Sequence, residues 1–223
     1  MNFGILDVLQ LVGALGLFLF GMTMMSEALQ KVAGNKMRAI LASMTKNRVL
    51  GVLTGVIVTS IIQSSSATTV MVVSFVNAGL LTLAESISVI MGANIGTTVT
   101  AWFVSLIGFK FSIADIAIPM IGFSLLFIFS KNDRRKSIGE VMIGFALLFI
   151  GLEYLKNSVP DIKANPEMLH FLTEYTNMGY GSILLFLLIG TILTVIVQSS
   201  SATMAITLVM LSQGWITFEI GAA

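Results

Sequence analysis

Long apolar segments dominate this sequence, and short charged stretches separate them. A helix that crosses a membrane needs about 20 consecutive apolar residues. Six segments are candidates for this role, and a further apolar stub begins at Trp215; the segments are Leu6–Leu29, Val49–Asn77, Leu80–Ile107, Phe111–Phe129, Ile138–Leu155 and Ile183–Leu211. Of all residues 56% are hydrophobic and 10% are charged, whereas about 25% of the residues in soluble domains are charged. The sequence therefore predicts an all-α, multi-pass membrane protein.

The composition excludes several classes of function. The 223 residues contain no Cys and a single His, His170, so disulfides, thiolate metal sites and His-based zinc or Ser–His catalytic sites lack the necessary residues. The serine clusters described below have no basic side chain beside them that could activate a nucleophile. We therefore expect no enzyme and no cofactor. A net charge of +1 gives no reason to expect a nucleic-acid partner.

The distribution of charge predicts the topology. Lys31–Arg48 carries five basic residues and no acid, and Lys131–Lys136 carries four basic residues, so the positive-inside rule makes both of them cytoplasmic loops. The acidic stretch Glu153–Glu174 is predicted to be external. Three apolar segments separate the two basic loops, but an even number of crossings is required. Val49–Asn77, interrupted at QSSS, is therefore predicted to enter and leave on the cytoplasmic side, which places the N-terminus outside the inner (plasma) membrane.

An internal repeat accompanies this pattern. Thr54–Thr69 aligns without gaps to Ile189–Met204, most positions are identical, and both segments contain QSSSAT. The similarity continues weakly, with Gly79 and Thr82 matching Gly214 and Thr217. We predict two repeats, residues 1–136 and 137–223, with re-entrant hairpins at about 49–77 and 183–211. Three crossings per repeat invert the second copy, and inverted repeats with broken helices are typical of secondary transporters.

The broken segments suit the binding of an anion together with a cation. A break at QSSS exposes a helix N-terminus, whose N–H groups and dipole attract an anion. Serine hydroxyls, the Gln carbonyl and unwound backbone carbonyls can coordinate a hard cation. No Lys or Arg lies in either hairpin, so co-bound cations must offset the charge of an anion. Two other roles for QSSS are a flexible polar linker and hydrogen bonding between helices.

A third polar feature, Gly92–Thr98 with the sequence GANIGTT, lies within Leu80–Ile107. Two glycines that flank Asn94 inside an apolar segment predict a second kind of unwound turn, in which Asn94, Thr97 and Thr98 supply oxygen ligands. The alternative is a glycine-mediated contact between helices.

Two copies of QSSSAT, with GANIGTT after the first, resemble the bacterial branch of the sodium/phosphate cotransporter family, which is related to the animal type II sodium–phosphate cotransporters. The resemblance covers essentially the whole chain. It implies a sodium-coupled symporter of inorganic phosphate that works by alternating access, with the paired QSSS hairpins forming one shared site. The candidate substrate and sodium ligands are Gln63, Ser64, Ser65, Ser66, Thr68, Asn94, Thr97, Thr98, Gln198, Ser199, Ser200, Ser201 and Thr203. Those assigned to sodium are Gln63, Ser65, Asn94, Thr98, Gln198 and Ser200.

Other functions stay open at this stage. The same scaffold could carry or export another oxyanion, or the chain could be a membrane phosphate sensor or anchor that does not transport. The expected partners are phosphate, sodium and the lipid bilayer, and a homo-oligomer and a PhoU-like regulatory domain or protein are further candidates. The spacing of the repeat places a second GANIGTT at about residues 227–233, so we expect the natural protein to continue past Ala223, with its two hairpins facing each other.

Overall fold

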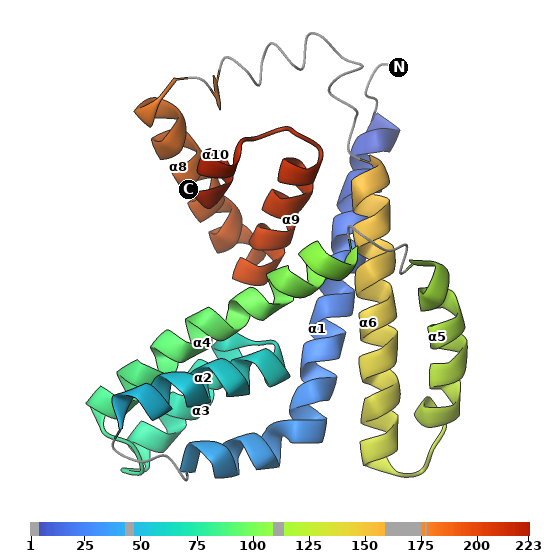
Figure 1. Ribbon diagram of the computed structural model, residues 1–223. Helices are drawn as coiled ribbons and strands as arrows, with labels where there is room; N and C mark the ends of the chain where they lie inside the picture. Colours follow the sequence, from blue (N-terminus) through green and yellow to red (C-terminus); the bar gives the residue numbers. More distant parts are fainter. Residues whose placement is uncertain (1–4, 43–46, 109–113, 159–174, 177) are drawn as a thin grey trace. The chain divides into compact units, whose positions relative to one another are not determined.

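A computed structural model describes residues 5–42, 47–108, 114–158, 175–176 and 178–223. Regular secondary structure in these residues is helical throughout (Figure 1). The helices are α1 (Ile5–Ala42), α2 (Arg48–Ile62), α3 (Ser65–Asn77), α4 (Leu83–Phe103), the π-helical turn η1 (Val104–Gly108), α5 (Ala114–Ile128), α6 (Asp133–Ser158), α8 (Tyr180–Val197), α9 (Ser200–Ser212) and α10 (Phe218–Ala222). The prediction of an all-α protein is confirmed for this part of the chain.

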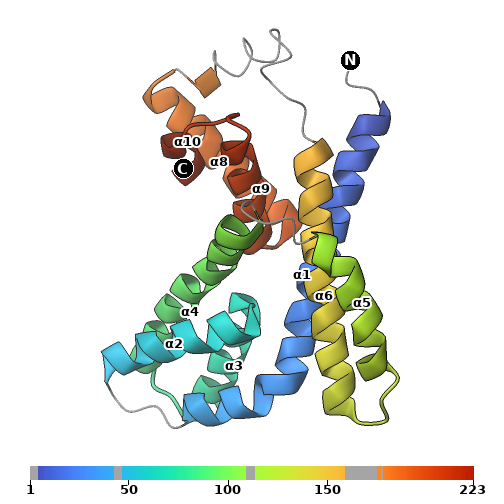
Figure 2. The ribbon, with the colours of Figure 1, turned by 45° about the vertical axis from the view of Figure 1, so that its right-hand side comes forward.

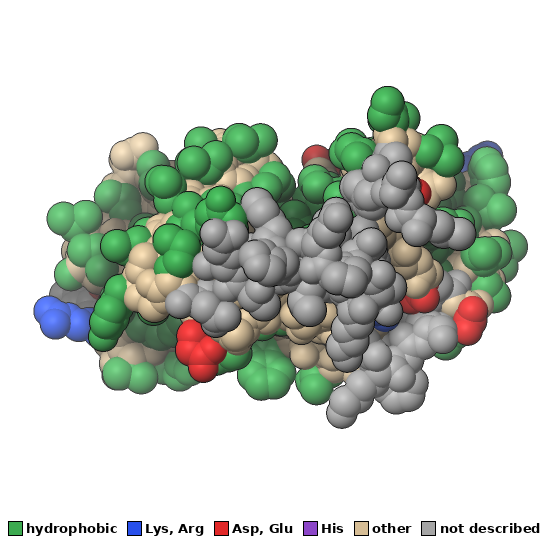
Figure 3. Space-filling view, turned by 90° about the horizontal axis from the view of Figure 1, so that it is seen from above, with side chains coloured by type: hydrophobic (Ala, Val, Ile, Leu, Met, Phe, Trp, Pro, Cys, Tyr) green, Lys and Arg blue, Asp and Glu red, His purple; other side chains and the backbone are tan. Residues whose placement is uncertain are grey.

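Four of the described helical segments are long and apolar enough to cross a membrane. They are Ile5–Gly34, Leu83–Leu106, Asp133–Ser158 and Tyr180–Val197. Helices α2, α3, α5 and α9 are apolar but shorter. Hydrophobic side chains cover much of the described surface in Figure 3, and charged side chains are few there. Such a surface suits a lipid environment, because monomeric soluble proteins rarely expose large continuous apolar patches.

The chain forms two compact units, each described by itself. The larger is Leu17–Ile150, and the smaller joins Met1–Gly16 to Gly151–Ala223. These units do not correspond to the predicted repeats, whose boundary at residue 136 stays a prediction.

In the larger unit, α4 packs along α2, and α3 lies beside both (Figures 1 and 2). Glycines allow this close approach: a Cβ added to Gly55 would lie 2.8 Å from the backbone nitrogen of Ala93, and one added to Gly96 would lie 2.7 Å from the carbonyl oxygen of Val56. A Cβ on Gly92 would collide with the carbonyl oxygen of Val52. The helix backbones are therefore in contact at these glycines.

Helix α1 also contacts this group of helices through its C-terminal part, which turns away from the long axis of the helix (Figure 1). Met37 and Leu41 are buried in one cluster with Val58, Val72 and Val89. Residues 31–42 were expected to belong to a polar loop, and this expectation is wrong, because α1 continues to Ala42. Lys and Arg are good helix formers, and burial of Met37 and Leu41 stabilises the extra turns.

Helices α1 and α6 cross closely in the larger unit. A Cβ on Gly21 would lie 2.8 Å from the carbonyl oxygen of Gly144. Further along the same contact, Lys31 Nζ on α1 lies 2.9 Å from a carboxylate oxygen of Glu140 on α6. Helix α5 packs against α6 at Gly139, where an added Cβ would lie 3.0 Å from Ile128. Two glycines and one ion pair thus fix the α1–α6 contact.

In the smaller unit, α8, α9 and α10 pack together. The turn after α9 has the same backbone as the turn after α3: Gly79 and Gly214 have φ of 70° and 74°. Thr82 and Thr217, the residues that precede α4 and α10, have φ of −79° and −80°. The weak sequence similarity at these four positions therefore corresponds to a repeated local structure.

Candidate functional site: two serine-capped helix breaks

The first break separates α2 from α3 at Gln63 and Ser64. Gln63 has φ 59° and ψ 25°, the left-handed conformation, and its N–H donates to the Thr59 carbonyl at 2.7 Å. Ser64 is extended, with φ −145° and ψ 107°. Positive φ is uncommon outside glycine, and glycine is the usual residue at this helix-end position. The presence of glutamine at a position that favours glycine indicates that the glutamine side chain makes contacts that glycine could not make.

Ser64 caps the helix that follows the break. Its hydroxyl accepts a hydrogen bond from the N–H of Ala67 at 3.2 Å, and its carbonyl accepts one from the N–H of Thr68, also at 3.2 Å. Helix geometry gives the N–H groups of Ser65 and Ser66 no acceptor within α3. Two backbone donors without a helical partner therefore lie at the positive end of the helix dipole, in the segment that also carries the hydroxyls of Ser64, Ser65 and Ser66.

The second break repeats this geometry 135 residues later. Gln198 has φ 57° and ψ 23°, and Ser199 has φ −145° and ψ 108°. The Ser199 hydroxyl accepts from the N–H of Ala202 at 3.3 Å. In both breaks the glutamine Nε2 donates to the carbonyl three residues earlier, that of Ser60 or Val195. The prediction that both helical segments break at QSSS is confirmed, whereas re-entry into a membrane stays a prediction.

A threonine pair spans each break, and the sequence analysis named only one member of each pair. Thr59 Oγ1 donates to Thr68 Oγ1 at 2.9 Å, and Thr194 Oγ1 donates to Thr203 Oγ1 at 3.0 Å. Thr68 and Thr203 in turn donate to the carbonyls of Ser64 and Ser199, respectively, at 3.0 and 3.3 Å. Each hydroxyl chain ties the helix before the break to the helix after it. The second member of each pair could have been predicted, because Thr59 and Thr194 are identical in the aligned repeats.

Two further residues, which the sequence pattern did not predict, hold the first break from neighbouring helices. On α1, the Ser26 hydroxyl donates to the carbonyl of Ile62 at 3.1 Å. On α4, the Thr100 hydroxyl donates to Gln63 Oε1 at 2.6 Å. The Ile62 carbonyl is one of the backbone groups that the end of α2 leaves without a helical partner, whereas Thr100 holds the side chain of Gln63. Ser26 and Thr100 lie 36 and 37 positions from their partners in the sequence. No local sequence pattern predicts such long-range contacts.

The predicted unwound turn at GANIGTT is wrong: Gly92–Thr98 is continuous helix within α4. The alternative, a glycine-mediated contact, is what the structure has, since Gly92 and Gly96 lie against α2. The hydroxyls of Thr97 and Thr98 donate to carbonyls of their own helix. Asn94 and Thr98 are exposed, whereas Thr97 is on the buried face. Their assignment as ligands stays a prediction.

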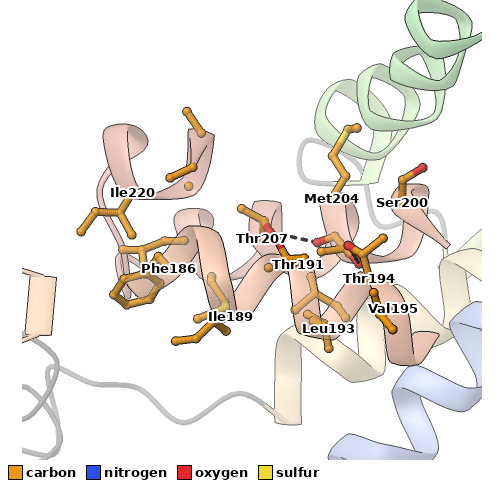
Figure 4. A pocket seen from close by; sticks show the side chains of 18 residues that line it. Phe186, Ile189, Thr191, Leu193, Thr194, Val195, Ser200, Met204, Thr207 and Ile220 are labelled. Carbon is orange, nitrogen blue, oxygen red and sulfur yellow. Dashed lines mark hydrogen bonds between the residues drawn. The ribbon is translucent and has the colours of Figure 1, made fainter. Parts of the chain in front are cut away.

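A pocket of about 530 Å³ lies among α8, α9 and α10 (Figure 4). Of the predicted site residues, Ser200 and Thr203 line it, and Thr194 and Thr207 add further hydroxyls. The Thr207 hydroxyl donates to the Thr203 carbonyl at 2.9 Å. Gln198, Ser199 and Ser201 lie at the same break but are not part of the lining.

The predicted site residues fall into two sets. Gln63 to Thr68 and Asn94 to Thr98 belong to the larger unit, and Gln198 to Thr203 belong to the smaller one. A single site shared by the two sets therefore stays a prediction. No group of three or more His, Asp or Glu residues that could hold a metal occurs in the described part of the chain.

Comparison with known proteins now decides the family. Residues 17–157, more than half of the chain, match a protein family described as Na+/Pi-cotransporter. The chain belongs to this family. YjbB of Escherichia coli K12, named for a proposed role in inorganic phosphate export, is 31% identical over 216 residues, or 96% of this chain. YqeW of Bacillus subtilis, which is uncharacterised, is 31% identical over 200 residues, covering 88% of this chain and 61% of YqeW.

The human sodium-dependent phosphate transport protein 2B is 41% identical over 105 residues, 46% of this chain and 15% of its own length. The chain spans 38% of the length of YjbB. No solved structure matches. Membership in the Na+/Pi-cotransporter family confirms the resemblance drawn from the QSSSAT and GANIGTT motifs and identifies the chain as part of a transporter family.

Proposed function

We propose that this protein carries inorganic phosphate across the inner membrane, that sodium co-binding drives the movement, and that access to the site alternates between the two sides. The observation that supports this most is the pair of equivalent breaks. Each joins a serine-capped helix N-terminus to a glutamine held at positive φ. Inverted repeats with half-helices that meet near the midplane are the usual arrangement in secondary transporters.

The chemistry of the breaks supports coupling to a cation. The backbone donors and serine hydroxyls favour an anion. No Lys or Arg lies between Val49 and Asn77 or between Ile183 and Leu211, so bound phosphate would stay uncompensated in a medium of low dielectric constant, which is costly. Sodium ions coordinated by Gln63, Ser65, Gln198 and Ser200 would supply the opposite charge, with Asn94 and Thr98 as further candidates.

Export is the second candidate for the direction of net flux. The name of YjbB associates that relative with phosphate export, and its similarity covers 96% of this chain. The site chemistry is the same for uptake and export, because the direction depends on the gradients that the protein experiences. Export would also require sodium, because the bound anion needs the same compensation of charge.

Purified protein in proteoliposomes tests the proposal. Uptake of radiolabelled phosphate should rise when an inward sodium gradient is imposed, and a potassium gradient of the same size should leave uptake at the level of empty liposomes. Phosphate movement that ignores sodium would contradict the coupling. Saturable phosphate binding without any flux would favour a sensor or anchor, and sulfate transported in preference to phosphate would favour another oxyanion.

A further inference from the structure

A cavity of about 350 Å³ lies inside the larger unit, among α1, α2, α4 and α6. Most of the side chains that line it are apolar, and three of them are aromatic. The apolar lining includes Met25, Leu29, Phe103, Phe145, Leu148 and Phe149. None of the side chains described in its lining is charged. Neither phosphate nor sodium would be stable against the apolar part of these walls.

One end of the cavity is polar. The Ser60 hydroxyl is buried and has no hydrogen-bond partner among the described residues. Gln63 and Thr100, which bond to each other, also line the cavity. A buried hydroxyl is almost always paired in native proteins, and an unpaired one calls for an explanation. A bound molecule that offers one hydrogen-bonding group at this end would provide the missing partner.

We propose that this cavity binds a small, uncharged aromatic molecule that carries one hydroxyl group. Its ring would pack against Phe145 and Phe149, whose ring centroids lie 4.7 Å apart, and its hydroxyl would bond with Ser60 Oγ. Aromatic rings favour offset or edge-on neighbours of this kind, and the volume is within the range of small-molecule pockets. Ile61 and Phe103 line the cavity and are 39% and 47% exposed, so the guest reaches it from an apolar surface.

The guest would lie beside Gln63 and would restrict the cap of the first break. This inference goes beyond the proposed transport function and does not depend on it, because binding can be measured without phosphate or sodium.

Fluorine NMR of 4-fluorophenol, added to the full chain in nanodiscs, tests the site. A saturable component is expected above the partitioning seen in empty nanodiscs. Leu148→Trp fills the cavity from a side chain that is 3% exposed and should remove the saturable component. Leu126→Trp is the matched control, since Leu126 is 73% exposed and lies outside the cavity. Equal binding by Leu148→Trp and the wild type would overturn the proposal.

A second variant covers the case in which Leu148→Trp does not fold. Ser60→Ala removes only the hydroxyl and should weaken the binding of 4-fluorophenol about two- to tenfold, the usual effect of one hydrogen bond. Fluorobenzene, which has no hydroxyl, should bind Ser60→Ala as well as it binds the wild type. If the affinities for both ligands fell equally, or neither changed, the assignment of the Ser60 hydroxyl as the ligand's partner would be rejected.

Discussion

The Thr100 hydroxyl on α4 donates to the side-chain oxygen of Gln63 at 2.6 Å, and this bond fixes the glutamine that closes α2. Thr100 is 5% exposed, so water could not easily take the place of its hydroxyl as the donor to Gln63. The α4 helix therefore contributes to the first break through a residue outside the GANIGTT motif.

Thr100→Val, which keeps the shape and removes the hydroxyl, should lower the free energy of unfolding by about 0.5–1.5 kcal/mol, because the partly buried oxygen of Gln63 loses its donor. Thermal unfolding followed by circular dichroism in detergent would measure the loss. Thr23→Val is the matched control, since Thr23 is exposed on α1 and its replacement should change little. Equal melting temperatures for Thr100→Val and the control would show that the bond contributes nothing to stability.

The repeat offers a second comparison, between Gly55 and Gly190, which lie 135 residues apart at equivalent positions. A Cβ at Gly55 would lie 2.8 Å from the backbone nitrogen of Ala93, whereas a Cβ at Gly190 would meet nothing within 4 Å. Gly55→Ala should therefore destabilise the protein by about 1–3 kcal/mol through overpacking. Gly190→Ala should be neutral, or stabilising by up to about 1 kcal/mol through helix propensity. Similar unfolding curves for the two variants would refute the close α2–α4 contact.

Substitution of single serines should have graded effects on phosphate binding. Ser65→Ala and Ser200→Ala each remove one hydroxyl next to a free helix N–H, and the apparent affinity for phosphate should fall by about 0.5–3 kcal/mol. Raising the sodium concentration should restore part of the affinity, because linkage between two ligands is reciprocal. Isothermal titration at several sodium concentrations would measure this. A phosphate affinity that falls but does not respond to sodium would contradict linkage between the phosphate and sodium sites.

The predicted topology can be tested by labelling, because the chain contains no native cysteine. A cysteine introduced at Asn132, in the basic segment before α6, should react with a membrane-impermeant maleimide only after the cells are opened. A cysteine at Asn165, which lies outside the described residues, should react in intact cells. The reverse pattern would invert the proposed orientation.

Sequence patterns predicted the helices and both breaks well, for reasons tied to particular residues. QSSS interrupts two apolar runs, and each break occurs between the glutamine and the first serine. The equivalence of Gly79 with Gly214 was also visible, because both glycines have the positive φ that a helix C-terminus requires. In these places a local property of the residue determines the backbone.

Where the prediction failed, packing between distant segments decided the structure. The glycines of GANIGTT predict an unwound turn, since glycine costs about 1 kcal/mol in a helix. In the structure Gly92 and Gly96 lie against the backbone of α2, and the helix continues. The bonds of Ser26 and Thr100 to the first break likewise depend on how α1 and α4 pack, which no local window of sequence contains.

The central claim is that the two glutamines at positive φ are required for transport beyond any part they play in the fold, and Gln63→Gly and Gln198→Gly test it most directly. Glycine adopts positive φ without the steric cost that glutamine bears, so Gln198→Gly should melt at or above the temperature of the wild type. Gln63→Gly also loses the hydrogen bond from Thr100, so it should lose about as much stability as Thr100→Val, offset in part by the relief of positive φ. Both should nevertheless lose sodium-driven uptake of radiolabelled phosphate into proteoliposomes, because the amide that we propose as a ligand is gone. Wild-type uptake by both variants, with a sodium dependence like that of the native chain, would contradict the account and leave QSSS a structural element.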